Sequence, residues 1–175
     1  MGRNSGFTLI ELIVTLALAV IVLTFGVPGF QRAIYNNRLV TVINEFIGAL
    51  NLARSEAIKR GVRVTLCKSG NGASCASSGG YEQGWIVFID PNSNATVDAG
   101  ESIIRVFESI PGQTGMTLTG NRPVARYISY VATGATQSIG GAFQAGALTL
   151  CAAPNARRIV INMAGRIRTE ETSCL

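Results

Sequence analysis

Histidine is absent from this chain of 175 residues, and only 14% of its residues are charged. Without histidine, the chain cannot form a Ser-His-Asp or Cys-His nucleophilic site or a histidine-ligated zinc site. Catalysis would have to rely on the ten carboxylates, on lysines or on thiols. We therefore expect a protein that is not an enzyme, with no catalytic residue, no metal ligands and no cofactor.

The shortage of charge accompanies a hydrophobic content of 47% and a mean hydropathy of +0.33. This composition is too apolar for a disordered chain, and the length is that of one domain. One long apolar run extends from Phe7 to Phe30, with Glu11 as its only charged residue. As a helix it would be roughly 36 Å long, enough to cross a bilayer core of about 30 Å. We expect residues 7–30 to span a membrane.

Two ordinary interpretations of this run are a secretory signal peptide and a plain membrane anchor. The run is long for a signal peptide and lacks an Ala-x-Ala-like cleavage site. A plain anchor does not explain Glu11, because a carboxylate costs on the order of 2.5 to 3.5 kcal/mol at the bilayer centre and less near the interface. Glu11 therefore requires a partner.

The segment Gly6-Phe7-Thr8-Leu9-Ile10-Glu11-Leu12 resembles the processing site of type IV prepilins. The resemblance implies that a prepilin peptidase cleaves between Gly6 and Phe7 and methylates the new amine, so that residues 1–6 are a leader. It also implies that Glu11 neutralises the cationic N-terminus of a neighbouring subunit during assembly. Opposite charges attract strongly in a low-dielectric bundle, whereas either charge alone would be penalised.

Apolar residues recur every three or four positions from Leu39 to Ala57, which predicts an amphipathic helix over residues 31–60. Gly61 is expected to cap this helix, which should end near Arg60. Pro28 lies between the apolar run and the amphipathic segment. It predicts a kink there, because proline removes a backbone hydrogen bond and clashes with the preceding turn.

From residue 61 onward, short apolar segments alternate with glycine-rich or polar turns, which predicts a mainly β head over residues 61–175. Apolar residues alternate with Arg63 and Thr65 in the first segment, as in a half-buried antiparallel strand. Residues 134–146 are expected to form a loop or an edge. The predicted strands are Val62–Cys67, Trp85–Asp90, Ile103–Phe107, Met116–Thr119, Arg126–Val131, Ala147–Cys151, Arg158–Met163 and Arg166–Thr169.

All four cysteines lie in this head, and none forms a Cys-x-x-Cys pair. An even number of cysteines with this spacing indicates two disulfides in an oxidising compartment rather than a metal or redox site. Of the three possible pairings, Cys67–Cys75 with Cys151–Cys174 requires the least rearrangement. Free buried thiols are the alternative.

The segment Asp90–Glu101 places acids and amides at positions 1, 3, 5, 9 and 12 of an EF-hand-like calcium loop. However, Ala95 stands where the turn glycine of such a loop would be, and the flanking segments are strand-like rather than helical. We therefore interpret the segment as a polar hairpin loop in which Asp and Asn side chains satisfy the turn backbone.

The net charge is +5, and basic residues gather in the C-terminal part of the chain. Arg166 and Arg168 are two residues apart and should share one face of a strand, with Arg157 and Arg158 on a nearby strand. Such a stripe could contact successive phosphates of DNA without reading bases, and its binding would depend strongly on salt. The alternative is a solvated β-edge whose charges block aggregation.

Five segments carry a further resemblance: Leu52–Gly61, Val64–Cys67, Gly84–Asp90, Gly146–Cys151 and Gly165–Arg168. Together they resemble the FimT/GspH family of minor pilins and pseudopilins, and more closely its FimT/FimU-like branch. The resemblance implies an α+β, pilin-like fold. In this fold a long kinked N-terminal helix, transmembrane and then amphipathic, packs on a mainly antiparallel β-sandwich-like head.

The function implied by this resemblance is that of a minor pilin, incorporated into a type IV pilus as an assembly or tip subunit. It implies a single-pass protein of the inner membrane with a periplasmic head, which then joins an extracellular pilus. Its partners would be prepilin peptidase and other pilins, contacted through the N-terminal helix. One alternative is a DNA-binding minor pilin for natural transformation, because Gly165-Arg166-Ile167-Arg168 matches the GRxR motif of DNA-binding FimT proteins. The other is a GspH-like minor pseudopilin of type II secretion.

Overall fold

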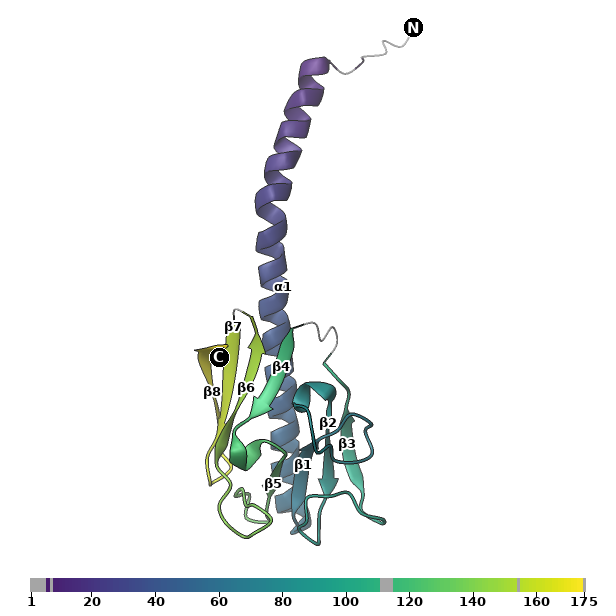
Figure 1. The fold of residues 1–175 in the computed structure, drawn as a ribbon, viewed down its shortest axis with the longest axis vertical. Helices are drawn as coiled ribbons and strands as arrows, with labels where there is room; N and C mark the ends of the chain where they lie inside the picture. Colours follow the sequence, from purple (N-terminus) through teal and green to yellow (C-terminus); the bar gives the residue numbers. More distant parts are fainter. Residues whose placement is uncertain (1–5, 7, 111–114, 154, 175) are drawn as a thin grey trace. The chain divides into compact units, whose positions relative to one another are not determined.

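The computed structural model describes residues 6, 8–110, 115–153 and 155–174, apart from the side chains of residues 28, 31, 32 and 35. One α-helix, eight β-strands and two short 3-10 helices form the regular structure of these residues (Figure 1). The chain divides into two compact units, residues 1–38 and 39–175, and each is described by itself.

The helix α1 extends from Leu9 to Arg60 and contributes to both units. Its end at Arg60 confirms the predicted end of the amphipathic helix. Gly61 follows with a φ of 67°, and its N–H donates to the carbonyl of Ala57 at 3.0 Å, which closes the last turn. Pro28 lies within α1, and its side chain is outside the described part, so the kink stays a prediction.

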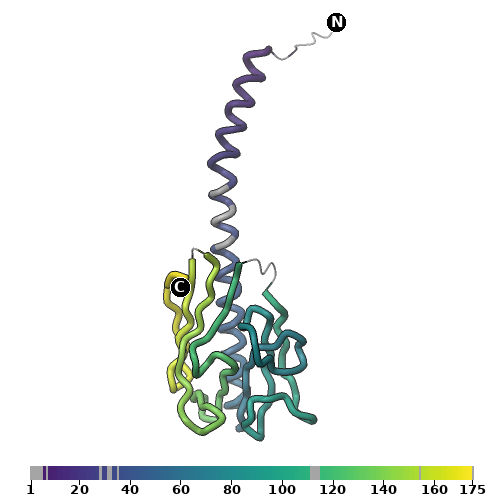
Figure 2. The backbone as a smooth tube through the Cα atoms, viewed as in Figure 1, coloured from purple at the N-terminus to yellow at the C-terminus, as the bar shows by residue number. Residues whose placement is uncertain are grey.

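Two four-stranded antiparallel sheets form the rest of the second unit (Figures 1 and 2). In their order across each sheet, the first contains β3 (Ile103–Phe107), β2 (Trp85–Ile89), β1 (Val64–Lys68) and β5 (Tyr127–Tyr130), and the second contains β4 (Met116–Gly120), β6 (Gly146–Ala152), β7 (Asn155–Ile161) and β8 (Ile167–Ser173). The 3-10 helices are η1 (Tyr81–Gln83) and η2 (Arg122–Val124). A strand is present near each predicted position, although β7 begins earlier and β8 extends further than predicted.

The core of this unit combines one face of α1 with the inner faces of both sheets. Phe46 is fully buried, and its ring lies 5.2 Å from that of Tyr81 and 5.1 Å from that of Trp85 in edge-to-face arrangements. Aromatic pairs at this spacing add to the stability that burial of apolar area supplies. The core contains the helix residues that the periodicity indicated, namely Leu39, Val42, Ile43, Phe46, Leu50, Ala53 and Ala57. It also contains Ala49, which the periodicity did not indicate.

The first strand differs from its predicted half-buried pattern, because all five residues of β1 are buried. Cys67 belongs to a second, smaller apolar cluster with Ile86 and Phe88 on the outer side of the sheet. Thr65 is also fully buried, and its hydroxyl donates to Asp90 at 2.7 Å. Segments far apart in the sequence therefore cover a face that the local pattern assigned to solvent.

Candidate functional site

The N-terminal end of α1 carries the predicted processing and assembly residues. Gly6 is exposed and lies outside the helix, whereas Phe7 lies outside the described residues. Thr8 caps the helix: its hydroxyl accepts from the N–H of Glu11 at 3.3 Å, and its carbonyl accepts from the N–H of Leu12 at 3.2 Å. A threonine at this position satisfies helix N–H groups that would otherwise lack a partner.

The segment Leu9–Val27 is long and apolar enough to cross a membrane, with a mean hydropathy of 2.6. None of it is buried within the chain, and Glu11 is its only charged residue. Its hydroxyl groups are satisfied locally, since Thr15 donates to the carbonyl of Leu12 at 2.9 Å and Thr24 donates to that of Val20. The apolar surface of this segment thus remains available for lipid or for another helix.

The four arginines of the predicted stripe do not lie on one face. The register of β7 and β8 pairs Arg158 with Glu170 and Val160 with Arg168, so these residues share the outer face of the sheet. Arg157 points to the opposite face, the face of Ile159, and forms an ion pair of 3.3 Å with Glu171. The predicted stripe is therefore reduced to Arg158, Arg166 and Arg168.

The outer face keeps an excess of positive charge. Arg168 forms an ion pair of 2.9 Å with Glu170, and surface pairs of this kind contribute about 0 to 1 kcal/mol. Arg158 and Arg166 have no ion pair among the described residues. Arg166 and Arg168 line a cavity of about 340 Å³ on this face and a second one of about 350 Å³ that α1 also lines.

The turn between β7 and β8 explains the glycine of the GRxR match. The N–H of Gly165 donates to Asn162 O at 2.9 Å, and the N–H of Asn162 donates to Arg166 O at 3.1 Å. Gly165 has a φ of 75°, as expected for a type I turn followed by a left-handed residue. A Cβ there would also lie 2.3 Å from Gly134 O. The hairpin therefore requires Gly165, whatever the arginines bind.

Arg54 of α1 is a residue of this region that the sequence reasoning missed. Its Nη1 donates to Gly165 O at 3.2 Å and its Nη2 donates to Ala164 O at 3.1 Å. Arg54 is half-buried and lies one residue from Ala53, at the flank of the buried stripe. A guanidinium at the edge of an apolar helix face was the available signal, because such a side chain needs acceptors from the element that it packs on.

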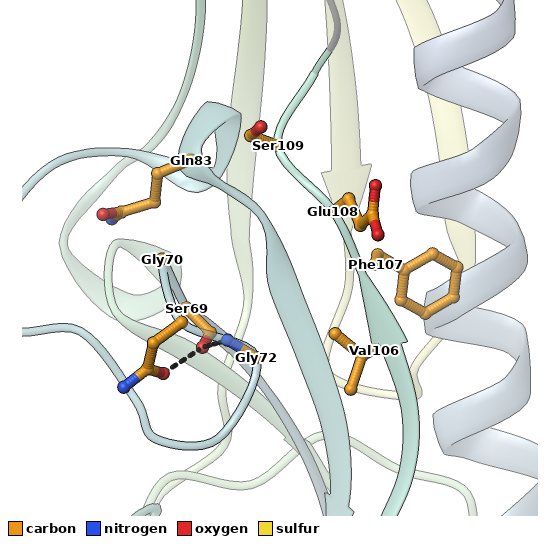
Figure 3. Close-up of a pocket in the computed structure, with 9 residues that line it drawn as sticks. Ser69, Gly70, Gly72, Gln83, Val106, Phe107, Glu108 and Ser109 are labelled. Atoms are coloured by element: carbon orange, nitrogen blue, oxygen red, sulfur yellow. Dashed lines mark hydrogen bonds between the residues drawn. The ribbon is translucent and has the colours of Figure 1, made fainter.

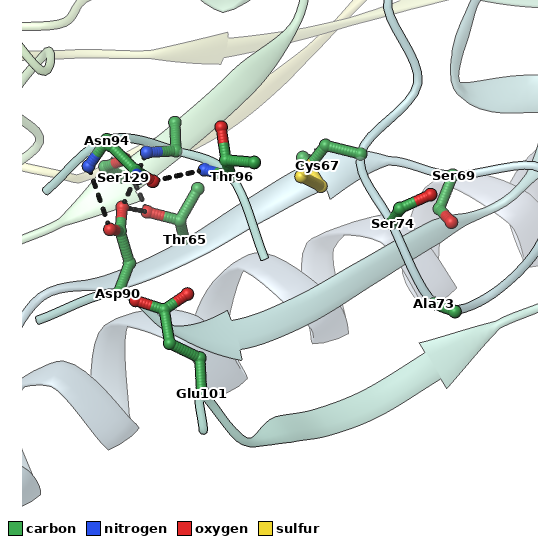
Figure 4. Close-up of a disulfide and its surroundings, with 12 residues drawn as sticks. Thr65, Cys67, Ser69, Ala73, Ser74, Asp90, Asn94, Thr96, Glu101 and Ser129 are labelled. Atoms are coloured by element: carbon green, nitrogen blue, oxygen red, sulfur yellow. Dashed lines mark hydrogen bonds between the residues drawn. A yellow bond between two sulfur atoms is a disulfide. The ribbon is translucent and has the colours of Figure 1, made fainter. Parts of the chain in front are cut away.

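The structure joins Cys67 to Cys75 and Cys151 to Cys174, the pairing that the spacing favoured. The first disulfide closes the loop after β1 and lies near Asp90 (Figure 4). The second links β6 to the residue after β8, across the intervening strand β7. Both bridges tie loops or chain ends to the sheets, which reduces the freedom of the unfolded chain.

The loop from Asp90 to Glu101 is held by its own acids and amides. Asp90 is fully buried and accepts from the N–H groups of Asn94 at 3.0 Å and Ala95 at 3.1 Å (Figure 4). Asp98 accepts from the side-chain amides of Asn92 and Asn94, both at 2.7 Å, and these bonds hold the pKa of Asp98 below its usual value. Among the described residues, no group of three His, Cys, Asp or Glu side chains is placed to hold a metal ion. The carboxylates therefore serve as turn acceptors, as the hairpin-loop interpretation requires.

A further cavity of about 320 Å³ lies between the loop after β1 and the end of β3 (Figure 3). Its lining combines polar residues with Val106 and Phe107, and the N–H of Gly72 donates to the hydroxyl of Ser69 at 3.1 Å. Glu108 is the charged side chain that lines it. No residue of this cavity was among the predicted site residues.

Comparison with protein families gives two matches. The model described as type II transport protein GspH matches residues 42–165, and the model described as prokaryotic N-terminal methylation motif matches residues 1–27. No curated protein sequence matches the chain.

Comparison with solved structures gives three matches. The type IV minor pilin FimU of Pseudomonas aeruginosa PAO1, in space group P21, is similar with a TM-score of 0.58 and 18% identity, over 81% of this chain and 98% of FimU. A second crystal form of FimU, in space group P65, is similar with a TM-score of 0.54 and 18% identity, over 78% of this chain and 100% of FimU. The minor pseudopilin EpsH of Vibrio cholerae matches with a TM-score of 0.49 and 11% identity, over 77% of this chain and 97% of EpsH. The similarity to FimU confirms the predicted pilin-like α+β fold.

Proposed function

We propose that this chain, which belongs to the GspH family, is a minor pilin incorporated into a type IV pilus. Pilins and pseudopilins are structural subunits rather than enzymes. The observation that carries the proposal is α1, in which an unburied apolar segment is followed, within one helix, by the segment that forms the core of the head. This arrangement suits a subunit that is anchored in a membrane before assembly and then packs into a helical bundle.

We further propose that prepilin peptidase cleaves between Gly6 and Phe7 at the inner membrane, with the head in the periplasm. Gly6 is exposed and precedes the helix, which begins at Leu9. Cleavage would place the new amine a few residues before Glu11, so each subunit would carry one positive and one negative charge at the same end of its apolar helix. In staggered neighbours the amine of one subunit could pair with Glu11 of another. Either charge without its partner would be penalised in an apolar bundle.

The test of this proposal is the variant Glu11→Ala. It should leave membrane insertion unchanged, because the apolar segment is intact, and should abolish incorporation into the filament. The two quantities are the amount of the chain in the membrane fraction and in sheared filaments. Thr15→Ala is the matched control, because it removes a polar group from the same segment whose hydroxyl is already bonded to the carbonyl of Leu12. Normal incorporation of Glu11→Ala would contradict the assembly role.

A second candidate function is DNA capture, supported by the three arginines of the outer face. Arg158 and Arg166 have no ion pair among the described residues, and the face offers no aromatic side chain for stacking. Binding would therefore be directed to phosphates and independent of sequence.

The test of DNA capture is a duplex-binding salt series on the full chain in detergent micelles. The slope of log K against log salt is negative, and each phosphate contact that is lost makes it shallower by about 0.9. Arg166→Gln combined with Arg168→Gln should flatten the slope, while Arg105→Gln, which removes an exposed charge from β3 of the other sheet, should not. Loss of pili rather than of DNA uptake in the double variant would support a structural role instead.

A third candidate, a minor pseudopilin of type II secretion, is favoured by the description of the family model that matches residues 42–165. The genes beside the coding sequence distinguish the candidates. Genes of a secretion system there would support the pseudopilin, and pilus genes would support the pilin.

A further inference from the structure

The turn that carries Arg166 is attached to the rest of the head through its carbonyl groups. The N–H of Thr136 donates to Met163 O at 3.2 Å, whereas its hydroxyl has Gln144 O as its shortest acceptor, at 2.5 Å. Arg54 donates to the next two carbonyls, those of Ala164 and Gly165. The carbonyls of Met163, Ala164 and Gly165 thus accept hydrogen bonds from outside the turn, and the carbonyl of Asn162 accepts one from the N–H of Gly165 within it.

The guanidinium of Arg54 is suited to this position. Its two terminal nitrogens form a rigid planar fork, so each can reach one of two adjacent carbonyls without loss of further rotational freedom. A lysine carries one nitrogen and could not span both. The cost of partly burying the charge is offset by these two charge-assisted hydrogen bonds.

The turn is also confined by Gly134 and Tyr130, which lie close to Arg54. A Cβ at Gly165 would lie 2.3 Å from Gly134 O and 2.9 Å from the ring of Tyr130. The N–H of Arg166 donates to the side chain of Asn162 at 2.9 Å, which connects the backbone of Arg166 to the same turn. Loss of the Arg54 bonds would leave the carbonyls of Ala164 and Gly165, directly before Arg166, without these donors.

We propose that Arg54 is a positioning residue, which holds the β7–β8 turn so that Arg166 is placed beside Arg168 for binding the phosphates of duplex DNA. The proposal rests on the DNA-capture function proposed above. Arg54 also lines the cavity of about 350 Å³ with Arg166 and Arg168, which raises direct contact with phosphate as the competing role. Its terminal nitrogens are directed at the turn carbonyls, which favours positioning.

A double-mutant cycle on the full chain in detergent micelles separates these roles. One phosphate contact at 0.1 M salt corresponds to about a tenfold change in affinity. Arg54→Ala and Arg166→Gln should each weaken duplex binding about tenfold, and the double variant should be no weaker than either single variant. Arg54→Ala with Arg158→Gln should instead be weakened about a hundredfold, because Arg158 is held by β7 and not by the turn. If the fold-losses in affinity caused by Arg54→Ala and Arg166→Gln multiply in the double variant, Arg54 contacts phosphate directly and the positioning role is overturned.

Hydrogen exchange of the turn amides tests Arg54 without DNA. In Arg54→Ala, exchange of the amides of Gly165 and Arg166, which donate within the turn, should rise at least severalfold. Arg54→Lys should restore part of the protection, and Asn51→Ala, on the same side of α1 and lining the same cavity, should leave it unchanged. Unchanged exchange in Arg54→Ala would overturn the proposal while leaving DNA capture intact. A wild-type chain that does not bind duplex DNA would overturn DNA capture, and the exchange result would still decide whether Arg54 holds the turn.

Discussion

Replacement of Gly165 by alanine tests whether the GRxR glycine is required by the fold. The head contains a second turn with the same hydrogen bonds, in which the N–H of Gly141 donates to Ser138 O at 3.0 Å and the N–H of Ser138 donates to Ala142 O at 2.8 Å. Gly141 has a φ of 83°, close to the 75° of Gly165. A Cβ at Gly141 would have nothing within 4 Å. Gly141→Ala is therefore a matched control that shares the backbone strain and lacks the collision.

The expected magnitudes follow from this difference. A left-handed alanine costs roughly 1 to 2 kcal/mol, and both variants should show this loss. At Gly165 the new Cβ would also meet Gly134 O at 2.3 Å, a backbone atom that cannot move away as a flexible side chain could. Overpacking of this kind costs about 1 to 3 kcal/mol more. Gly165→Ala should thus lower the free energy of unfolding by about 2 to 5 kcal/mol in total.

Trp85, the one tryptophan of the chain, is fully buried and reports unfolding by its fluorescence. Urea denaturation of both variants in detergent micelles should give a lower midpoint for Gly165→Ala than for Gly141→Ala, with an unchanged slope. In a thermal scan the difference should be about 2 to 12 °C for a chain of this size. Equal midpoints would refute the collision and leave the positive φ of Gly165 as the reason for a glycine there.

Three other predictions concern the core. Phe46→Ala should destabilise the head by about 3 to 5 kcal/mol in the same assay, whereas Ile58→Ala, on the same helix but 53% exposed, should cost no more than about 1 kcal/mol. Tyr81→Phe should lower the free energy of unfolding by about 0.5 to 1.5 kcal/mol, because the hydroxyl of Tyr81 donates to Val124 O at 2.8 Å. Tyr130→Phe should leave it unchanged, because the buried hydroxyl of Tyr130 has no partner within the described part of the chain. Burial raises the pKa of both tyrosines, so the unfolded state ionises first and stability should fall as the pH rises above about 10, less steeply in each Phe variant. Equal costs for the paired variants would contradict either prediction.

The elements with strong local signals could be predicted from the sequence. The end of α1 at Arg60 follows from the break in periodicity and from Gly61, and each strand lies near a short apolar segment bounded by turn residues. The burial of Thr65 could not be predicted in this way. Its cover comes from Asp90 and Ser129, which contact it from distant parts of the chain, and the local pattern contains no information on such packing.

The candidate site divides in the same way. The alternation of side chains along a strand correctly places Arg166 and Arg168 together, because it depends only on local geometry. The same alternation places the adjacent residues Arg157 and Arg158 on opposite faces, so the prediction that both belong to one stripe was wrong. Arg54 contributes from a helix more than a hundred residues away in sequence, and only the tertiary fold brings it to the turn.

The distribution of acids over the two faces changes what the arginines can do. Glu170 and Glu171 both precede the end of β8, and in the sequence they oppose the basic residues equally. In the structure Glu171 pairs with Arg157 on the inner face, whereas Glu170 lies on the outer face, where it pairs with Arg168. Arg158 and Arg166 thus keep their charge uncompensated among the described residues. Because an exposed pair such as Arg168 with Glu170 contributes little stability, a phosphate could displace the carboxylate at small cost. Glu170→Gln should therefore strengthen duplex binding, and Glu171→Gln should leave it nearly unchanged.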